Sequence, residues 1–331
     1  MFFRNFKFNK VGQTSITLLT NNNLTSNTRI SYSKVFYSTT IKMSKENLFV
    51  SPKWLNDNFE RVKILDASWF MPAEKRDSRG EFQQKHIKNS KFFDIDEICD
   101  KTVKLPHNLP SVEFFEKEMQ RLGIKNDDHV VIYDTRAQYV ASARVWWTFL
   151  VFGHDQSKVS LLEGGLPNWE KSGYSVESGP IVNNQDASIQ YKATYNGQLV
   201  RSKEEMLDNI QSKKFQVLDA RPGDRFWGRI DEPRPGLRRG HIPNSLNIPW
   251  VDLLSKDGGY HTKEQLEKLF SDKGVNLNEP ISTTCGSGTT AAVISLSLFK
   301  LGYPIPPIYD GSWSEYGQPS LKLPASCSND Q

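Results

Sequence analysis

Cysteine is scarce in this chain of 331 residues, which has only Cys99, Cys285 and Cys327. The number is odd, the spacings are wide and no C-x-x-C occurs, which argues against a disulfide framework or a structural zinc site. We therefore expect a reducing compartment and interpret each thiol by itself. Cys99 is interpreted as a partly buried small residue, and Cys327 as an exposed tail residue without function.

Acidic residues are absent from the first 45 positions, which carry seven Lys and Arg residues and many Asn, Ser and Thr. This composition is typical of a mitochondrial transit peptide. The alternative is a disordered tail of a cytosolic protein. Met43 could also serve as a second start and yield a form that stays in the cytoplasm.

Long apolar runs are absent as well, so we expect no membrane span. The formal net charge is +4, and beyond the first 45 residues basic side chains are interleaved with acidic ones. We therefore expect no nucleic-acid binding.

The chain contains an internal repeat. Four pairs of similar segments are separated by 153, 155, 151 and 147 residues, a slow drift that loop insertions in two copies of one fold would produce. The pairs align Val62–Trp69 with Phe215–Pro222, His86 with His241, Asp134 with Cys285, and Glu163 with Asp310.

Each copy alternates short β-rich runs with helical patterns. In the first copy "VKIL", "HVVIYD" and "KVSLLEG" indicate strands, and "SVEFFEKEMQRLG" and "SARVWWTFLVFG" indicate helices that end at a glycine. This alternation predicts an α/β protein with two tandem domains, each a mostly parallel sheet flanked by helices on both faces. The predicted parts are a presequence over 1–45, a first domain over 46–175, a linker over 176–198, a second domain over 199–322 and a tail over 323–331.

The stretch "TTCGSGTTAA" places Cys285 in a small, polar loop between a predicted strand and a helix that begins near Thr289. Gly286 and Gly288 allow the backbone N–H groups to turn inward, and such a nest at a helix N-terminus stabilises a thiolate or a persulfide anion. The structural alternative is a buried cysteine before a glycine turn.

Other cysteine chemistries fit this loop poorly. Cysteine phosphatases need an Arg at the end of the loop, but no Arg or Lys occurs from Cys285 through Phe299. A protease signature around Cys285 is also absent. Sulfur chemistry, in which the cysteine carries a sulfane sulfur, is the interpretation that is left.

Four motifs together resemble the two-domain rhodanese family, from about Leu48 to Leu321. They are most similar to the branch of that family that uses 3-mercaptopyruvate. The first domain has Asp134 in place of a cysteine, Thr289 replaces the usual Val, and Ala292 stands where a second cysteine is common. The motifs are "CGSGTTA", "YDGSWSEYG", "GHIPNSLNIP" and "DARPGDRFWGRIDEPRPG".

This resemblance implies a set of site residues. Cys285 would be the nucleophile, Ser287 would assist proton transfer, and Arg225 and Arg234 would bind the α-keto acid as planar donors. His86, with Asp77, is matched to proton transfer, although His86 could simply be a satisfied structural histidine. The loop residues expected to contact substrate are Gly286, Gly288, Thr289 and Thr290. Arg221 and the remaining histidines, His107 among them, are interpreted as structural or surface residues.

The implied activity is sulfur transfer from 3-mercaptopyruvate, through a persulfide on Cys285, to thioredoxin, another thiol or cyanide, with release of pyruvate. Thiosulfate, a compact dianion, suits a loop with cations after the cysteine, and Gly286 and Ser287 are neutral. The alternatives are a thiosulfate:cyanide sulfurtransferase and a non-catalytic module that binds a partner protein. No metal or organic cofactor is implied, and we expect a monomer or a weak dimer.

Overall fold

The computed structural model describes residues 48–184, 186, 188–256 and 258–327, all within one compact unit, Ser44–Gln331. The expected presequence over 1–45 and the second start at Met43 lie outside the described residues. None of the helices in the described part of the chain has both the length and the apolar composition needed to span a membrane.

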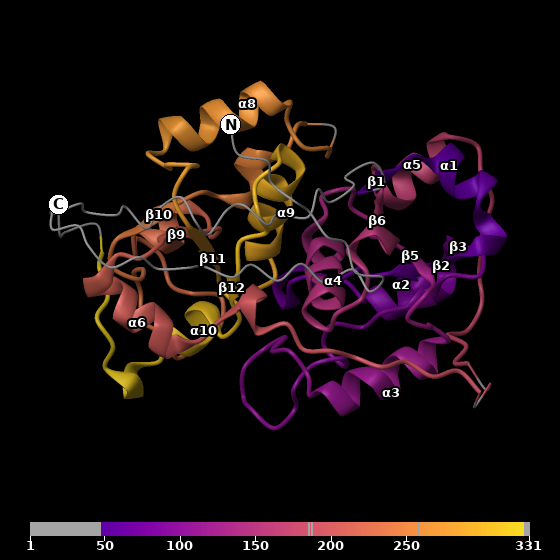
Figure 1. Ribbon diagram of the computed structural model, residues 1–331, viewed down its shortest axis with the longest axis horizontal. Helices are drawn as coiled ribbons and strands as arrows, with labels where there is room; N and C mark the ends of the chain where they lie inside the picture. The colour runs from indigo at the N-terminus through magenta and orange to yellow at the C-terminus, as the bar shows by residue number, and fades with distance from the viewer. Residues whose placement is uncertain (1–47, 185, 187, 257, 328–331) are drawn as a thin grey trace, which may run out of the picture. The chain divides into compact units, whose positions relative to one another are not determined.

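The first domain contains a parallel five-stranded sheet in the order β1-β6-β5-β2-β4 (Figure 1). A small antiparallel pair, β3 with β7, lies outside this sheet. The strands are β1 Phe49–Val50, β2 Val62–Asp66, β3 His86–Ile87, β4 Lys91–Phe92, β5 His129–Tyr133, β6 Val159–Leu162 and β7 Val176–Glu177. The α-helices are α1 Pro52–Asp57, α2 Ser78–Gln84, α3 Val112–Leu122, α4 Val140–Val151 and α5 Gly165–Lys171.

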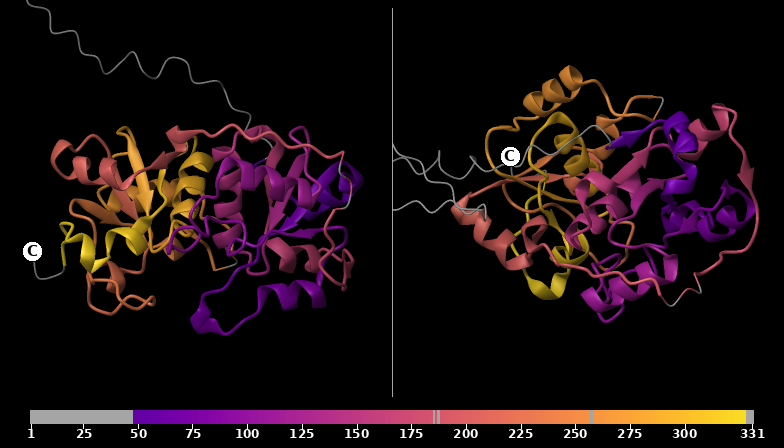
Figure 2. Two further views of the ribbon diagram at one scale, coloured as in Figure 1. Left: turned by 90° about the horizontal axis from the view of Figure 1, so that it is seen from below. Right: turned by 45° about the vertical axis from the view of Figure 1, so that its right-hand side comes forward.

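The second domain repeats this arrangement, because its parallel sheet has the equivalent order β8-β12-β11-β9-β10. Helices cover both faces of each sheet (Figure 2), which confirms the predicted fold. The strands are β8 Val200–Arg201, β9 Gln216–Asp219, β10 Ser245–Asn247, β11 Ile281–Thr284 and β12 Ile308–Tyr309. The α-helices are α6 Lys203–Ser212, α7 Gly223–Phe226, α8 Lys263–Asp272, α9 Ala291–Leu301 and α10 Ser312–Tyr316.

Short 3-10 helices lie in the connections, at Phe59–Arg61, Pro72–Glu74, Gln156–Lys158, Gly197–Leu199, Trp250–Leu253 and Pro319–Leu321. The two helix ends predicted at glycines are confirmed. Gly123 ends α3 in the left-handed conformation with φ of 78°, and Gly153 has the same φ two residues after the end of α4. Both glycines adopt a backbone conformation that other residues avoid.

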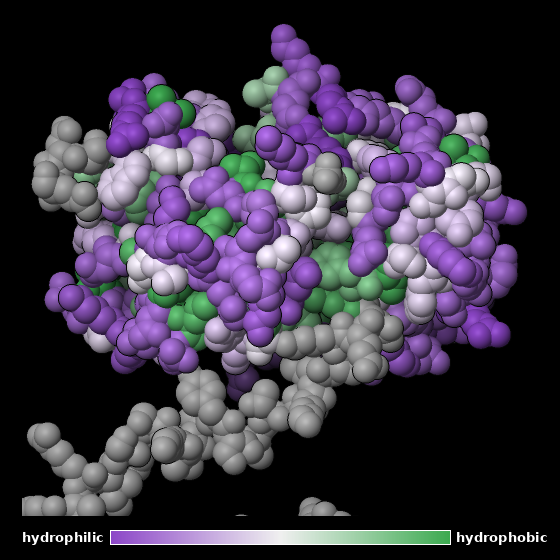
Figure 3. Space-filling model, turned by 90° about the horizontal axis from the view of Figure 1, so that it is seen from above, coloured by the Kyte–Doolittle hydropathy of each residue, from purple (hydrophilic) through white to green (hydrophobic). Residues whose placement is uncertain are grey.

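Helices α4 and α9 pack against each other and join the two domains (Figure 1). Eleven consecutive residues of α4, 141–151, and nine of α9, 291–299, are buried. Both stretches are mostly apolar, and a helix buried on all sides must be covered by other parts of the chain, so one hydrophobic core continues through both domains. The face shown in Figure 3 is mostly hydrophilic, with hydrophobic residues in small areas.

Candidate active site

Cys285 follows β11 directly, at the carboxyl end of the parallel strands, where α/β proteins commonly bind ligands. It is buried, with 2% of its surface exposed. The loop is fixed from outside by the start of α10. Trp313 N donates to the Cys285 carbonyl at 3.0 Å, and Ser314 N and Oγ donate to the Gly286 carbonyl at 2.9 Å and 2.6 Å.

The start of α10 thus binds the carbonyls of Cys285 and Gly286, and Ser312 Oγ accepts from the Cys285 N–H at 3.3 Å. Within the described part of the chain, no acceptor is found for the backbone N–H groups of residues 286–290. Amides that have no acceptor among the described residues, next to the start of α9, are suited to binding an anion. This arrangement matches the predicted nest, although α9 begins at Ala291, two residues later than expected, with Thr290 as its N-cap.

Arg225 and Arg234 both approach the loop at Gly286. A side chain built on Gly286 would place its Cβ 2.9 Å from Arg225 Nη2 and 3.8 Å from Arg234 Nη1. Arg225 donates to Glu232 at 2.5 Å through Nη2 and at 3.3 Å through Nε. Arg234 forms no ion pair with any described residue, and burial, opposed by Cys285, lowers its pKa. A partly buried guanidinium without a carboxylate partner is suited to binding an anionic ligand.

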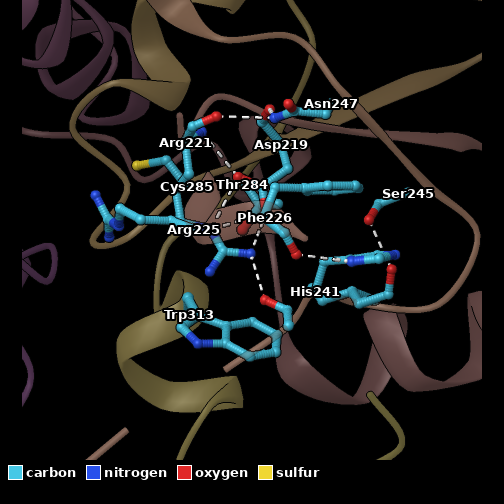
Figure 4. Close-up of polar contacts among 12 residues, drawn as sticks. Asp219, Arg221, Arg225, Phe226, His241, Ser245, Asn247, Thr284, Cys285 and Trp313 are labelled. Carbon is cyan, nitrogen blue, oxygen red and sulfur yellow. Dashed lines mark hydrogen bonds and ion pairs between the residues drawn. The ribbon is translucent and has the colours of Figure 1, made fainter. Parts of the chain in front are cut away.

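Arg221 has a structural role, as predicted. Its guanidinium is fully buried, bonds Asp219 through Nε and Nη2, and reaches Glu232 at 2.8 Å through Nη1. It lies 4.5 Å from the Trp313 ring. In Figure 4, Arg221 extends toward Trp313, while Cys285 and Arg225 point to the other side. Glu232 therefore links the structural Arg221 to Arg225 at the site.

A histidine of the first domain contacts the loop. His107 Nδ1 lies 3.2 Å from Ser287 Oγ and 3.1 Å from Thr289 Oγ1, and His107 Nε2 lies 2.8 Å from Asp96 Oδ1. Because the carboxylate of Asp96 only accepts, Nε2 carries the proton, and Nδ1 can accept from Ser287. Burial lowers the pKa of His107, so the neutral ring predominates at neutral pH. Trp69 Nε1 donates to Asp96 Oδ2 at 2.9 Å.

The structure places His86 and Asp77 in local contacts of the first domain and not at Ser287. His86 Nδ1 is 2.7 Å from the Phe82 carbonyl, its ring stacks on Phe82 at 4.1 Å, and Nε2 faces Glu177 at 3.3 Å. Asp77 is the N-cap of α2. No hydrogen bond joins either residue to the cysteine loop among the described residues.

The repeat explains why His86 is structural. Its counterpart His241 makes the same contacts in the second domain, with Nδ1 2.9 Å from the Phe226 carbonyl and its ring 3.8 Å from the Phe226 ring (Figure 4). Because only the second domain carries a cysteine in this loop, contacts that both domains share indicate a structural role for the histidine.

Sequence reasoning missed His107 and Asp96. Both lie in the connection between β4 and α3, which shows no periodicity, and they are eleven residues apart. The available signal was position, because a loop that follows a parallel strand opens at the same edge of a sheet as other such loops. Of the remaining predicted contacts, Gly288 has a left-handed φ of 75° and Thr289 is buried beside His107.

A cavity of about 780 Å³ lies beside the Asp134 loop of the first domain rather than at Cys285. Its lining includes the rings of Phe49, Tyr139 and Tyr260 and the side chains of Lys171 and Lys300. The described residues hold no group of three or more His, Cys, Asp or Glu side chains arranged to bind a metal ion.

The family model for the rhodanese-like domain matches residues 51–172 and 202–318. The chain belongs to the rhodanese family. Human 3-mercaptopyruvate sulfurtransferase is 41% identical to this rhodanese over 274 residues, which cover 81% of this chain and 91% of the human protein. Mouse thiosulfate sulfurtransferase is 41% identical over 276 residues, which cover 81% and 91% of the two chains.

The crystal structure of SseA from Escherichia coli, described as a 3-mercaptopyruvate sulfotransferase, superposes on this rhodanese with a TM-score of 0.72. It is 37% identical and covers 81% of this chain and all of its own. The chain is a sulfurtransferase of this family. Relatives named for the two sulfur donors are equally similar to it, so identity alone does not select the donor.

Proposed function

We propose that this protein transfers sulfur from 3-mercaptopyruvate to a thiol acceptor or cyanide through a persulfide on Cys285. The observation that carries the choice of donor is the hydrogen-bonded series Ser287–His107–Asp96 beside Cys285. Mercaptopyruvate has a thiol proton that must leave when its sulfur is transferred. Thiosulfate has no such proton, and a site for thiosulfate would need no proton relay.

The reaction begins with binding of the keto acid. The carboxylate of mercaptopyruvate lies against Arg234, which has no other carboxylate partner among the described residues, and against Arg225. The Cys285 thiolate attacks the substrate sulfur, an S–S bond forms and the C–S bond breaks, and its electrons pass into pyruvate enolate. The two guanidinium groups stabilise the enolate charge.

Proton transfer completes the first half of the reaction. The substrate thiol proton passes through Ser287 Oγ to His107 Nδ1, and Asp96 stabilises the imidazolium that forms. The same proton returns to the enolate carbon and gives pyruvate. The persulfide on Cys285 sits among the unpaired amides of residues 286–290. Thioredoxin, another thiol or cyanide then takes the outer sulfur and regenerates the thiolate.

A thiosulfate:cyanide sulfurtransferase is the second candidate. It is supported by Arg234, because a cation without a carboxylate partner among the described residues would also hold a dianion, and by the equal similarity to the mouse thiosulfate enzyme. A non-catalytic binding module is the weaker alternative, because such a module has no need for an unpaired anion seat around a cysteine.

Donor assays test this choice. We expect wild-type enzyme to release pyruvate from mercaptopyruvate with a higher kcat/KM than it releases sulfite from thiosulfate. His107→Gln should lower the mercaptopyruvate value by about a hundredfold, the usual contribution of one acid–base group, and leave thiosulfate turnover nearly unchanged. His86→Gln is the matched control and should not shift the ratio of the two donors. A thiosulfate preference in the wild type would reject the proposal, and absence of a mass shift on Cys285 with either donor would favour the binding module.

A further inference from the structure

A buried ion pair connects the two domains beside the cysteine loop. Arg144, on α4 of the first domain, places Nη2 2.6 Å from Oδ1 of Asp310, which follows β12 of the second domain. Only 2% of Arg144 and 8% of Asp310 is exposed. Removing two charges from water is costly, and such a pair is tolerated only with further hydrogen bonds. Its remaining contacts therefore show what the pair holds in place.

Those contacts are to the backbone on both sides of the Ser287–His107 hydrogen bond. Arg144 Nη2 donates to the His107 carbonyl at 2.6 Å, and Nη1 reaches the Gly288 carbonyl at 3.4 Å. Asp310 Oδ2 accepts from the backbone N–H of Leu109 at 2.8 Å. We call Arg144 and Asp310 the interdomain clamp.

His107 needs such an anchor because its backbone is strained. Its φ is 62°, in the left-handed region that residues other than glycine rarely adopt. The corresponding residue of the second domain is Gly258, with φ of 90°. The two are 151 positions apart, as Asp134 and Cys285 are, and each stands four residues before the N-cap of the next helix. The loop that meets the Cys285 loop thus has a histidine at a position where the backbone conformation favours glycine.

The repeat does not reproduce the interdomain clamp in the described residues. The position of α9 that corresponds to Arg144 is Ser295, again 151 residues later. Its hydroxyl stays within the second domain, 2.9 Å from Thr283 Oγ1 and 3.2 Å from the Pro306 carbonyl. Among the described residues, an arginine of this kind therefore reaches from the first domain to the Cys285 loop of the second, whereas its counterpart Ser295 does not reach back to the first domain.

We propose that Arg144 and Asp310 are positioning residues that hold His107 against Ser287, so that proton transfer at Cys285 requires both domains. This inference rests on the proposed function and on the relay described above. Neither residue is assigned a contact with substrate. Their effect is to fix the carbonyl of His107 and the amide of Leu109, and through them the direction of the imidazole.

A double-mutant cycle with His107 tests the proposal, with pyruvate release from mercaptopyruvate as the assay. Arg144→Met should lower kcat by about a hundredfold, which is the cost of misplacing a reacting group by about 1 Å, with little change in KM. In a His107→Gln background the same change should have almost no further effect, because the group being positioned is already lost. Asp310→Asn keeps the side-chain shape and should show the same pattern with a smaller loss.

Val145→Ala is the matched control, because Val145 is the fully buried neighbour of Arg144 on α4 and its apolar side chain cannot hydrogen-bond to the relay. Any fold-loss in kcat that Val145→Ala causes should multiply with the fold-loss of His107→Gln, because the two residues act independently. If the losses of both clamp variants also multiply with that of His107→Gln, or if neither variant lowers kcat, the clamp serves folding alone and the inference is overturned. A wild-type chain that released no pyruvate would instead overturn the proposed function, and this inference with it.

Discussion

A methyl group on Gly286 should push Arg225 away from the substrate. The added Cβ would lie 2.9 Å from Arg225 Nη2, closer than such atoms approach, and 3.8 Å from Arg234 Nη1. The backbone of Gly286 does not have a positive φ, so alanine is conformationally acceptable there. Arg225 must therefore move, and Glu232, which accepts its Nη2 at 2.5 Å, limits the directions that it can take.

The displaced guanidinium would lose one hydrogen bond to the substrate carboxylate. A hydrogen bond to a charged group contributes about 1.5–3 kcal/mol, which corresponds to a loss of roughly tenfold to a hundredfold in kcat/KM. Because the lost contact binds the substrate before and during the reaction, we expect most of the loss as a higher KM. Steady-state release of pyruvate from mercaptopyruvate is the assay, with thermal unfolding as a check on folding.

Gly223→Ala is the control for this experiment. Gly223 begins α7, the helix that carries Arg225, but the nearest atom to its added Cβ is Asn247 Oδ1 at 3.5 Å, an ordinary contact. We expect wild-type kinetics from this variant. An unchanged KM in Gly286→Ala, with Gly223→Ala also normal, would refute the assignment of the carboxylate to the arginines.

Three further predictions follow from the thiols, a buried carboxylate and the first residues. Cys285→Ser should abolish sulfur transfer in steady-state assays while Cys99→Ser and Cys327→Ser retain it, and activity in Cys285→Ser would contradict the mechanism. Burial raises the pKa of Asp66 to about 6, so the folded state holds this proton more tightly than the unfolded state. The resulting gain in folding stability is present at low pH and is lost as pH rises through 6. Urea unfolding of wild type and Asp66→Asn at pH 4 and pH 8 should differ in pH dependence by about 2 kcal/mol, and equal pH dependence would refute this. A reporter fused to residues 1–45 should enter mitochondria, and a purely cytosolic reporter would contradict the transit peptide.

The repeat and the cysteine loop were predictable because their signals are local. A strand, a glycine-containing loop and a helix within about twenty residues define how the amides turn toward Cys285. Arg225, on α7, and Arg234, in the loop that follows, are nine positions apart, so a single segment brings both to Gly286. The expectation that Arg221 is structural also rested on its own neighbourhood, since Asp219 and Glu232 lie within eleven residues of it.

Only the tertiary structure decided which histidine meets Ser287. The sequence favoured His86 and gave no sign of His107, but a local carbonyl and a stacked ring already satisfy His86. His107 is 180 positions from Ser287 and reaches it because α4 packs on α9 and brings two separate loops to one place. That docking depends on apolar surfaces from both domains acting together. No pattern within either segment encodes it, and so the cysteine could be assigned from the sequence while its proton relay could not.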